Sequence, residues 1–347
     1  MKLLIITQVV DKDHPILGFF HRWIKEFAKC CDTVYVICLQ EGKHNLPNNV
    51  IVMSLGKEKR RSRILYLVNF YRFIFKSVFI RRVDRIFVHM NEIYILLLTP
   101  LLPVLKLKGV ELTWWKAHGH LGKLTKMTRF VPDKIFTSSA GGFSIDTPKR
   151  YIVGQGIDTD FFSFCAEGHD MQKIISVGRL SPVKHHEEVI EVVGEAKKQG
   201  LSLKAAIIGP TDEKRPDYKE TLVNMIRQKG LSDQVQILSA QTQTEMRETY
   251  RTAGFIINAS DTDSLDKVVL EAMACGVIPV TSTKAYESVL SPFGLFVPKR
   301  DIPSIVSAMK YVYDMSAKGQ NDLRHKLRSI VERRHSLSSL VNKIIKI

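Results

Sequence analysis

The sequence predicts an α/β fold of two domains, each built on a parallel β-sheet with helices on both faces. Short apolar runs alternate with segments of helical periodicity along the chain, which is the pattern of successive βαβ units. The length of 347 residues is enough for two domains of ordinary size. A polar link at 163–172 separates the two alternating series, so the domain boundary is expected near that segment.

The first series is expected to supply one complete sheet and its helices. Its apolar runs predict strands at 2–7, 33–38, 50–53, 85–89, 110–114, 134–137 and 150–153. Segments with apolar residues at helical spacing predict helices at 18–30, 63–80, 92–105 and within 122–131. Pro100 and Pro103 mark the exit of the third helix.

The second series repeats the alternation. It predicts strands at 173–177, 204–209, 235–238, 255–258 and 277–280. It predicts helices at 185–199, 217–229, 244–252, 267–275, 302–315 and 321–347. Parallel sheets bind ligands at the carboxyl ends of their strands, so with two such domains face to face we expect the site in the cleft between them.

The N-terminus and the cysteines indicate a cytoplasmic protein. Residues 1–10 are apolar but lack a cleavage site of small residues, so they predict a first strand rather than a signal peptide. No run reaches the ~18 apolar residues of a transmembrane helix. The five cysteines show neither metal-ligand spacing nor a disulfide framework, which favours reduced thiols.

A basic segment at 57–85 carries much of the chain's formal charge of +16. It contains ten basic residues against Glu58 and Asp84, and helical apolar spacing runs between them. The residues expected to face an anionic membrane are Arg60, Arg61, Arg63, Arg72, Lys76, Arg81 and Arg82. The alternative is a helix packed on the first sheet with a solvated basic rim, and both can hold on different faces. No nucleic-acid recognition motif accompanies the charge.

Two segments of the second half suit a phosphate-bearing ligand. In GRLSPVK (178–184), a strand ends at Gly178, and Arg179 and Lys184 project from the turn as cationic donors. In DSLDKVVLEAMACGVIPVTS (263–282), a polar run leads into a helix whose N-terminus attracts anions, and Glu271 can accept from ribose hydroxyls. Taken singly, the first segment is also compatible with a solvated turn, and the second with a buried helix and strand.

Together and in this order, the two segments resemble the C-terminal domain of retaining, GT-B-fold glycosyltransferases of family 4, the glycosyl transferases group 1. The resemblance implies two Rossmann-like domains facing across a cleft. It implies an acceptor-binding domain at 1–160 and a nucleotide-sugar-binding domain at 161–325. The segment GIDTDFF (156–162) resembles the point at which the chain leaves the first domain in this family. Residues 326–347 are then expected to form a C-terminal helix that packs back on the first domain.

The resemblance also implies a role for each matching residue. Arg179, Lys184 and the helix N-terminus after Asp263 stabilise the departing diphosphate, while Glu271 holds the ribose. The residues expected at the nucleotide and its phosphates are Gly18, Gly178, Arg179, Lys184, Gly209, Ser264, Leu265, Asp266 and Glu271. Asp263 stands where the family pattern has Glu, one methylene longer, so the sugar or its pose is expected to differ from the usual one.

Histidines at strand ends complete the expected site. TWWKAHGH (113–120) resembles the strand-end segment in which a His meets the donor sugar, a role assigned to His118 with His120 as the alternative. His89 ends another strand and is assigned to the acceptor side, as is His120. Gly18 and Gly209 are equally compatible with plain loop or turn positions.

The function expected from the resemblance is that of a hexosyltransferase. It moves a sugar from a UDP- or GDP-sugar to an acceptor hydroxyl with retention, and the acceptor is expected to be a lipid-linked glycan of bacterial surface polysaccharide at the inner membrane face. No cofactor or metal is expected, since cationic side chains serve the diphosphate and the Asp-Thr-Asp strings at 158–160 and 261–263 are interpreted as non-metal features. The alternatives are a non-catalytic nucleotide-sugar-binding protein and, less favoured, a polyanion-binding protein.

Overall fold

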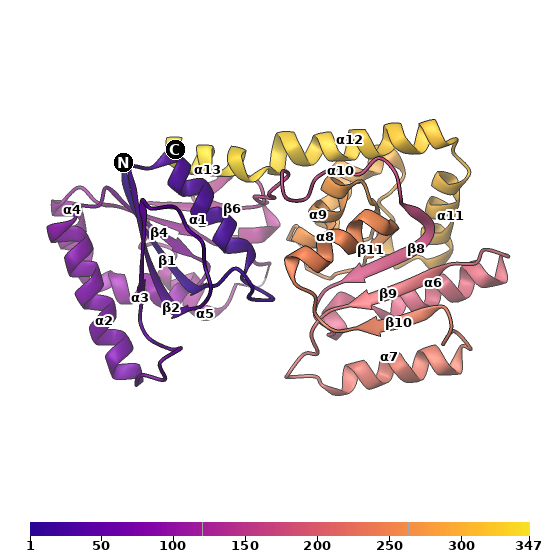
Figure 1. Ribbon diagram of the computed structural model, residues 1–347, viewed down its shortest axis with the longest axis horizontal. Coiled ribbons are helices and arrows are strands. Elements are labelled where there is room, and N and C mark those ends of the chain that lie inside the picture. The colour runs from indigo at the N-terminus through magenta and orange to yellow at the C-terminus, as the bar shows by residue number, and fades with distance from the viewer. Residues whose placement is uncertain (120, 263) are drawn as a thin grey trace. The chain divides into compact units, whose positions relative to one another are not determined.

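The computed structural model describes residues 1–119, 121–262 and 264–347. The chain divides into two compact units, shown in Figure 1. The first unit comprises Met1–Gly156 together with Leu337–Ile347, and the second comprises Ile157–Ser336. The predicted division after residue 325 falls inside a helix of the second unit, because that helix continues to His335.

The first unit contains a seven-stranded, parallel sheet of order β3-β2-β1-β4-β5-β6-β7. Its strands are β1 Lys2–Val10, β2 Thr33–Glu41, β3 Val50–Ser54, β4 Arg85–His89, β5 Glu111–Trp115, β6 Lys134–Thr137 and β7 Arg150–Ile152. All of these strands were predicted from their apolar runs. Burial on both faces explains why they read as continuous apolar runs rather than as alternating ones.

Helices cover both faces of this sheet. They are α1 Phe19–Cys30, α2 Arg63–Phe75, α3 Glu92–Leu98, α4 Leu102–Leu107, α5 Lys123–Thr128 and α13 Leu337–Lys346. Leu3 and Ile5 of β1 pack with α1 and α13, whereas the alternate residues Leu4 and Ile6 pack with α2, α3 and α4. The period of two along the strand therefore divides its side chains between two separate cores.

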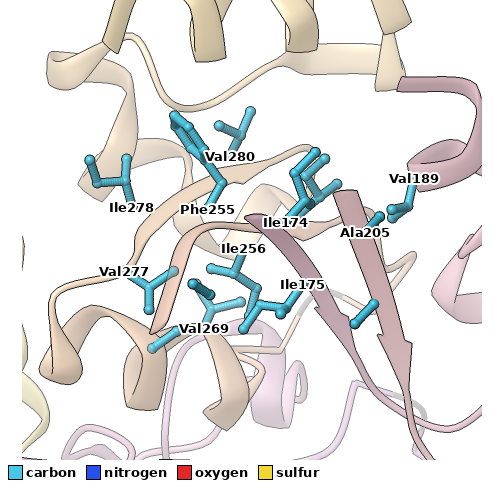
Figure 2. Close-up of a cluster of buried hydrophobic side chains, with 14 of the residues drawn as sticks. Ile174, Ile175, Val189, Ala205, Phe255, Ile256, Val269, Val277, Ile278 and Val280 are labelled. Carbon is cyan, nitrogen blue, oxygen red and sulfur yellow. The ribbon is translucent and has the colours of Figure 1, made fainter. Parts of the chain in front are cut away.

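The second unit contains a five-stranded, parallel sheet of order β10-β9-β8-β11-β12. Its strands are β8 Asp170–Val177, β9 Lys204–Ile208, β10 Val235–Leu238, β11 Ala253–Asn258 and β12 Ile278–Thr281. Its helices are α6 Glu187–Lys198, α7 Asp217–Gln228, α8 Gln243–Thr252, α9 Lys267–Cys275, α10 Glu287–Leu290, α11 Ile302–Tyr313 and α12 Ala317–His335. Figure 2 shows strand residues such as Ile174, Ile256 and Val280 in the apolar core of this unit, with Val189 and Val269 from the helices.

Three predicted helices are interrupted in the structure. The helix at 63–80 is α2 followed by a π-helical turn, η1 Lys76–Ile80. The helix at 92–105 is α3 and α4 joined by a 3₁₀ turn at its prolines, η2 Thr99–Leu101. The helix at 321–347 is wrong as a single element, because Ser336 adopts an extended backbone and bridges Ile157, which separates α12 from α13.

Among the described residues, no helix combines the length and the apolar character that crossing a bilayer requires.

Candidate functional site

The strand order of the second unit places one candidate site at the carboxyl ends of β8 and β11. The two strands are neighbours, and the chain leaves β8 toward β9 on one side and enters β12 from β11 on the other. Such a switch in strand order opens a crevice outside the carboxyl ends of the two strands, where ligands bind in open parallel sheets. The segments 178–184 and 259–266 follow these two strands, so the fold brings together the two motifs that the sequence singled out.

The glycines of this edge are required by a close approach of two backbones. Gly178 follows β8 and its amide donates to the Ile208 carbonyl at 2.9 Å. A Cβ on Gly209 would lie 1.7 Å from the Gly178 carbonyl oxygen, so no other residue fits there without moving the backbone. Gly178 and Gly209 therefore shape the base of the site together.

Arg179 projects from this edge into solvent. Its side chain is 60% exposed, and its Nη1 lies 3.9 Å from the Asp212 carboxylate. The Arg179 carbonyl accepts from Nε2 of His186 at 3.1 Å, while Ser176 Oγ lies 3.0 Å from Nδ1 of the same ring. Burial lowers the pKa of His186 to about 4, so the ring is neutral and fixes the Arg179 backbone through one defined tautomer. The guanidinium is thus available to an anion while its backbone is held in place.

Lys184 is held by Asp266 at the start of α9. Lys184 Nζ donates to the two carboxylate oxygens at 2.8 and 2.7 Å and to Ser260 Oγ at 3.3 Å. Asp266 occupies the N-cap position of α9, yet its side chain accepts no bond from the amides of its own helix. Asn258 Nδ2 donates to the same carboxylate at 2.9 Å. The capping carboxylate is therefore turned toward Lys184, and the ion pair stands beside the positive end of the α9 dipole.

A second charged cluster lies beside the first. Asp261 contacts His185 Nε2 at 2.6 Å and Arg300 Nη1 at 2.5 Å. Arg300 Nε also lies 3.0 Å from Glu188. Burial raises the pKa of Glu188 to about 8, although the Arg300 charge opposes the shift. Arg300 thus links the start of α6 to the polar segment before α9.

Glu271 lies one turn inside α9 and is buried. Tyr250 Oη donates to its carboxylate at 3.2 Å. Burial lowers the pKa of Lys267, on the preceding turn, while the Glu271 charge acts in the opposite direction. A buried carboxylate held by a tyrosine is a preformed acceptor for ligand hydroxyl groups.

The first unit has a polar cavity at the corresponding place in its own sheet, the carboxyl ends of β1 and β4. The cavity measures about 420 Å³ and is lined by Gln8, His89, Glu92 and Lys116 among others. Lys116 is buried and its Nζ donates to Glu92 Oε2 at 2.9 Å. Burial raises the pKa of Glu92, but the hydrogen bonds from Lys116, Thr125 and the Glu92 backbone amide, together with the Lys116 charge, outweigh burial and leave this pKa below its ordinary value.

His89 and Gly18 have structural partners within the first unit. The His89 ring stacks on Phe20 with centroids 3.9 Å apart, and its Nδ1 lies 3.3 Å from Thr7 Oγ1. The Gly18 amide donates to the His14 carbonyl at 2.9 Å, and a Cβ on Gly18 would lie 2.6 Å from that oxygen. Packing of the loop therefore accounts for this glycine, and its predicted contact with a phosphate stays a prediction.

The sugar-contacting residues remain predictions. His118 follows β5, is exposed, and its amide donates to the Gly142 carbonyl at 2.8 Å. Asp263 and His120 lie outside the described residues. Ser264 and Leu265 precede α9 in the same segment as Asp266.

The structure adds several residues that the sequence motifs missed. His186, Ser260 and Arg300 all contact predicted site residues or their partners. His186 lies two residues after the 178–184 motif, so its position next to a predicted phosphate-binding turn was a usable signal. Arg300 lies far along the chain from both motifs, and only the fold brings it to Asp261.

The basic residues of 57–85 are not equivalent. Exposed members of the group are Lys57, Lys59, Arg60, Arg61, Arg63, Arg72, Lys76 and Arg82. Arg81 differs, because its guanidinium lies 4.3 Å from the Tyr35 ring centroid and 3.0 Å from Met53 Sδ. Arg81 therefore packs against the sheet rather than facing solvent, and Arg85 is buried, with its guanidinium paired to Glu111.

Known structures share this fold. The Anabaena HepE structure in complex with UDP and glucose superimposes with a TM-score of 0.75 at 14% identity, covering 100% of this chain and 98% of that one. The lipopolysaccharide outer core galactosyltransferase WaaB gives a TM-score of 0.69 at 14% identity over 100% of both chains. With its two parallel-sheet α/β units, the chain is a GT-B-fold protein.

Sequence comparison then gives the family. The profile of glycosyl transferases group 1 matches residues 160–333, half of the chain, and the chain belongs to that family. D-inositol 3-phosphate glycosyltransferase of Frankia alni is 24% identical over 147 residues, 39% of this chain and 36% of that protein. The Mycolicibacterium smegmatis enzyme of the same name is 31% identical over 140 residues, 38% of this chain and 31% of that one. The match spans about a third of these curated relatives.

Proposed function

We propose that the protein is a retaining hexosyltransferase that transfers a sugar from a UDP- or GDP-sugar to an acceptor hydroxyl. The observation that carries this proposal is the juxtaposition of Arg179, Lys184 and the N-terminus of α9 at the carboxyl edge of one sheet. Two cationic side chains and a helix N-terminus suit a diphosphate. Family membership supports the same reading.

The proposed chemistry stabilises negative charge on the departing nucleoside diphosphate. Arg179 and the α9 amides meet the phosphates, and Lys184 shifts part of its bonding from Asp266 to the ligand. Glu271 accepts from the ribose hydroxyls, and Asp263 and His118 orient the sugar. A phosphate oxygen of the leaving group takes the acceptor proton, so the proposal assigns no separate base. These fixed cations also lead us to propose that no metal ion is essential.

The proposed acceptor site is the polar cavity of the first unit. Its Lys116–Glu92 ion pair and His89 offer both donors and acceptors to hydroxyl groups of a glycan. We further propose that the acceptor is a lipid-linked glycan of bacterial surface polysaccharide synthesis and that the protein works on the inner face of the cytoplasmic membrane. The exposed basic residues of 57–85 support this membrane contact.

The test is release of free nucleotide from a panel of UDP-, GDP- and ADP-sugars, with the double variant Arg179→Ala/Lys184→Ala as control. The expected result is slow hydrolysis of one donor that the double variant loses. Binding of a donor without turnover, even with glycan acceptors added, would favour a non-catalytic nucleotide-sugar-binding protein. Absence of both binding and turnover would refute the proposed function.

A further inference from the structure

An apolar groove lies on the first unit, away from the carboxyl ends of its strands. It has a volume of about 350 Å³, within the roughly 300–1,000 Å³ of ligand sites. The segment α2–η1 forms one wall and η2–α4 the other. Its lining includes Ile74, Phe75, Val78 and Phe79 from the first wall and Val104 and Leu105 from the second.

The surface around the groove exposes large apolar side chains. Phe75 is 58% exposed, Val68 54% and Leu107 85%, although the same elements bury Ile74 and Leu105 beneath them. Each element therefore has one apolar side in the core and a second apolar side in solvent. Exposed apolar side chains on the elements that form an apolar groove are typical of an interaction site.

Basic side chains surround the groove. Arg72 lines it and is the charged residue among its described lining residues, and Lys76 begins the following turn, η1. Across the groove, Lys106 and Lys108 are exposed at the end of α4, and Lys108 Nζ lies 5.4 Å from the Phe79 ring centroid. Residues 99–110 include no Asp or Glu. An apolar channel with cationic groups at its rim is complementary to a hydrocarbon chain that carries an anionic headgroup.

We propose that this groove binds an acyl chain of an anionic membrane phospholipid, with Arg72, Lys76 and Lys108 at the headgroup. The proposal rests on the membrane contact in the proposed function and gives that contact a specific site. It also assigns a role to α4, which lies outside the basic segment 57–85. A chain buried in the groove gains roughly fourfold in affinity for each methylene removed from water.

The dependence of binding on the length of the lipid's acyl chain distinguishes this groove from a flat, basic surface that binds headgroups only. The experiment titrates the full-length protein with lysophosphatidylglycerols of increasing chain length, each below its critical micelle concentration, so that no bilayer is present. The wild-type affinity is expected to rise with each added methylene until the groove is filled. Binding that is independent of chain length, or equal binding of the matching lysophosphatidylcholines, would overturn the proposal.

Matched variants locate the binding in the groove. Val104→Trp fills the groove, whereas Val68→Trp places the same side chain on the exposed side of α2 outside the lining. Val104→Trp is expected to abolish the dependence on chain length, and Val68→Trp to keep it. Phe79→Ser removes part of a wall without adding bulk, and its affinity is expected to fall by more than about tenfold. This variant tests the groove independently in case Val104→Trp misfolds.

Other occupants give different results. A wild-type dimer that Val104→Trp dissociates would identify the groove as a contact between two copies and overturn the lipid proposal. Tight binding of a polyprenyl phosphate without binding of lysophosphatidylglycerol would assign the groove to the acceptor lipid instead, which also overturns it. Hydrolysis of the sugar nucleotide is expected to be unchanged in all three variants, so failure of the groove and failure of the transferase proposal are distinguishable.

Discussion

The ion pair between Lys184 and Asp266 makes opposite predictions for stability and for nucleotide binding. The pair joins Nζ to the carboxylate oxygens at 2.7 and 2.8 Å, and the two side chains are only 18% and 15% exposed. Lys184→Met leaves the Asp266 carboxylate with Asn258 as its remaining side-chain donor among the described residues. A partly buried carboxylate that loses its cation but keeps one hydrogen bond destabilises a protein by about 2–3 kcal/mol.

The carboxylate partner behaves differently. Asp266→Asn leaves Lys184 its bond to Ser260 and a flexible stem that reaches solvent, so we expect a smaller loss of about 1–2 kcal/mol. The double variant Lys184→Met/Asp266→Asn is expected to lose less free energy of unfolding than the two single variants lose together, with a coupling energy of roughly 1–2 kcal/mol. The two substitutions are expected to change the affinity for UDP in opposite directions. Lys184→Met weakens binding about tenfold or more, while Asp266→Asn removes a negative charge near the diphosphate and tightens it about fivefold.

The two units can be followed separately in the unfolding assay. Trp23, Trp114 and Trp115 all lie in the first unit, so their fluorescence reports that unit, whereas far-ultraviolet circular dichroism also reports the second. In urea unfolding, the Lys184 and Asp266 substitutions should lower the transition midpoint of the second unit and leave the transition seen by tryptophan fluorescence unchanged. The reasoning is refuted if Asp266→Asn weakens UDP binding as much as Lys184→Met does, because Asp266 would then position the lysine rather than compete with the ligand.

Three further predictions concern single residues of the second unit. Because burial raises the pKa of Glu188 to about 8, its contribution to stability is full below about pH 4.5 and falls as pH rises toward 8. Glu188→Gln is therefore expected to flatten the fall in urea midpoint over that range, and an unchanged pH profile would contradict the assignment. Gly209→Ala is expected to destabilise the second unit by more than about 2 kcal/mol, since its Cβ meets the Gly178 carbonyl at 1.7 Å; a thermal melt like that of the wild type would contradict it. Glu271→Ala is expected to weaken binding of UDP and uridine alike, as measured by calorimetry, while Tyr250→Phe controls for the lost hydrogen bond; unchanged uridine affinity would remove Glu271 from the ribose.

Much of the fold could be predicted from the sequence because local apolar patterns determine it. Strands buried on both faces appear as short apolar runs, and β1 and β11 were both placed in this way. The break between α12 and α13 could not be predicted, because it depends on the pairing of Ser336 with the distant Ile157. The local helical pattern continues on both sides of Ser336, so nothing nearby in the sequence marks the change of unit.

The candidate site shows the same division between local and distant information. Gly178, Lys184 and Glu271 belong to motifs whose order in the chain places them after adjacent strands of a parallel sheet. The pairing of Lys184 with Asp266, and the link from Arg300 to Asp261, depend on side-chain packing between segments far apart in sequence. Patterns of residue type indicate which elements meet, whereas the partners of each charge follow only from the assembled sheet.

The measurement that tests the central claim most directly compares the affinities of UDP and uridine by calorimetry, for the wild type and for Arg179→Ala/Lys184→Ala. If the diphosphate lies at the carboxyl ends of β8 and β11, UDP binds the wild type at least about tenfold more tightly than uridine, and the double variant loses that difference while keeping its uridine affinity. An equal preference for UDP in both proteins would place the diphosphate elsewhere and contradict the proposed site.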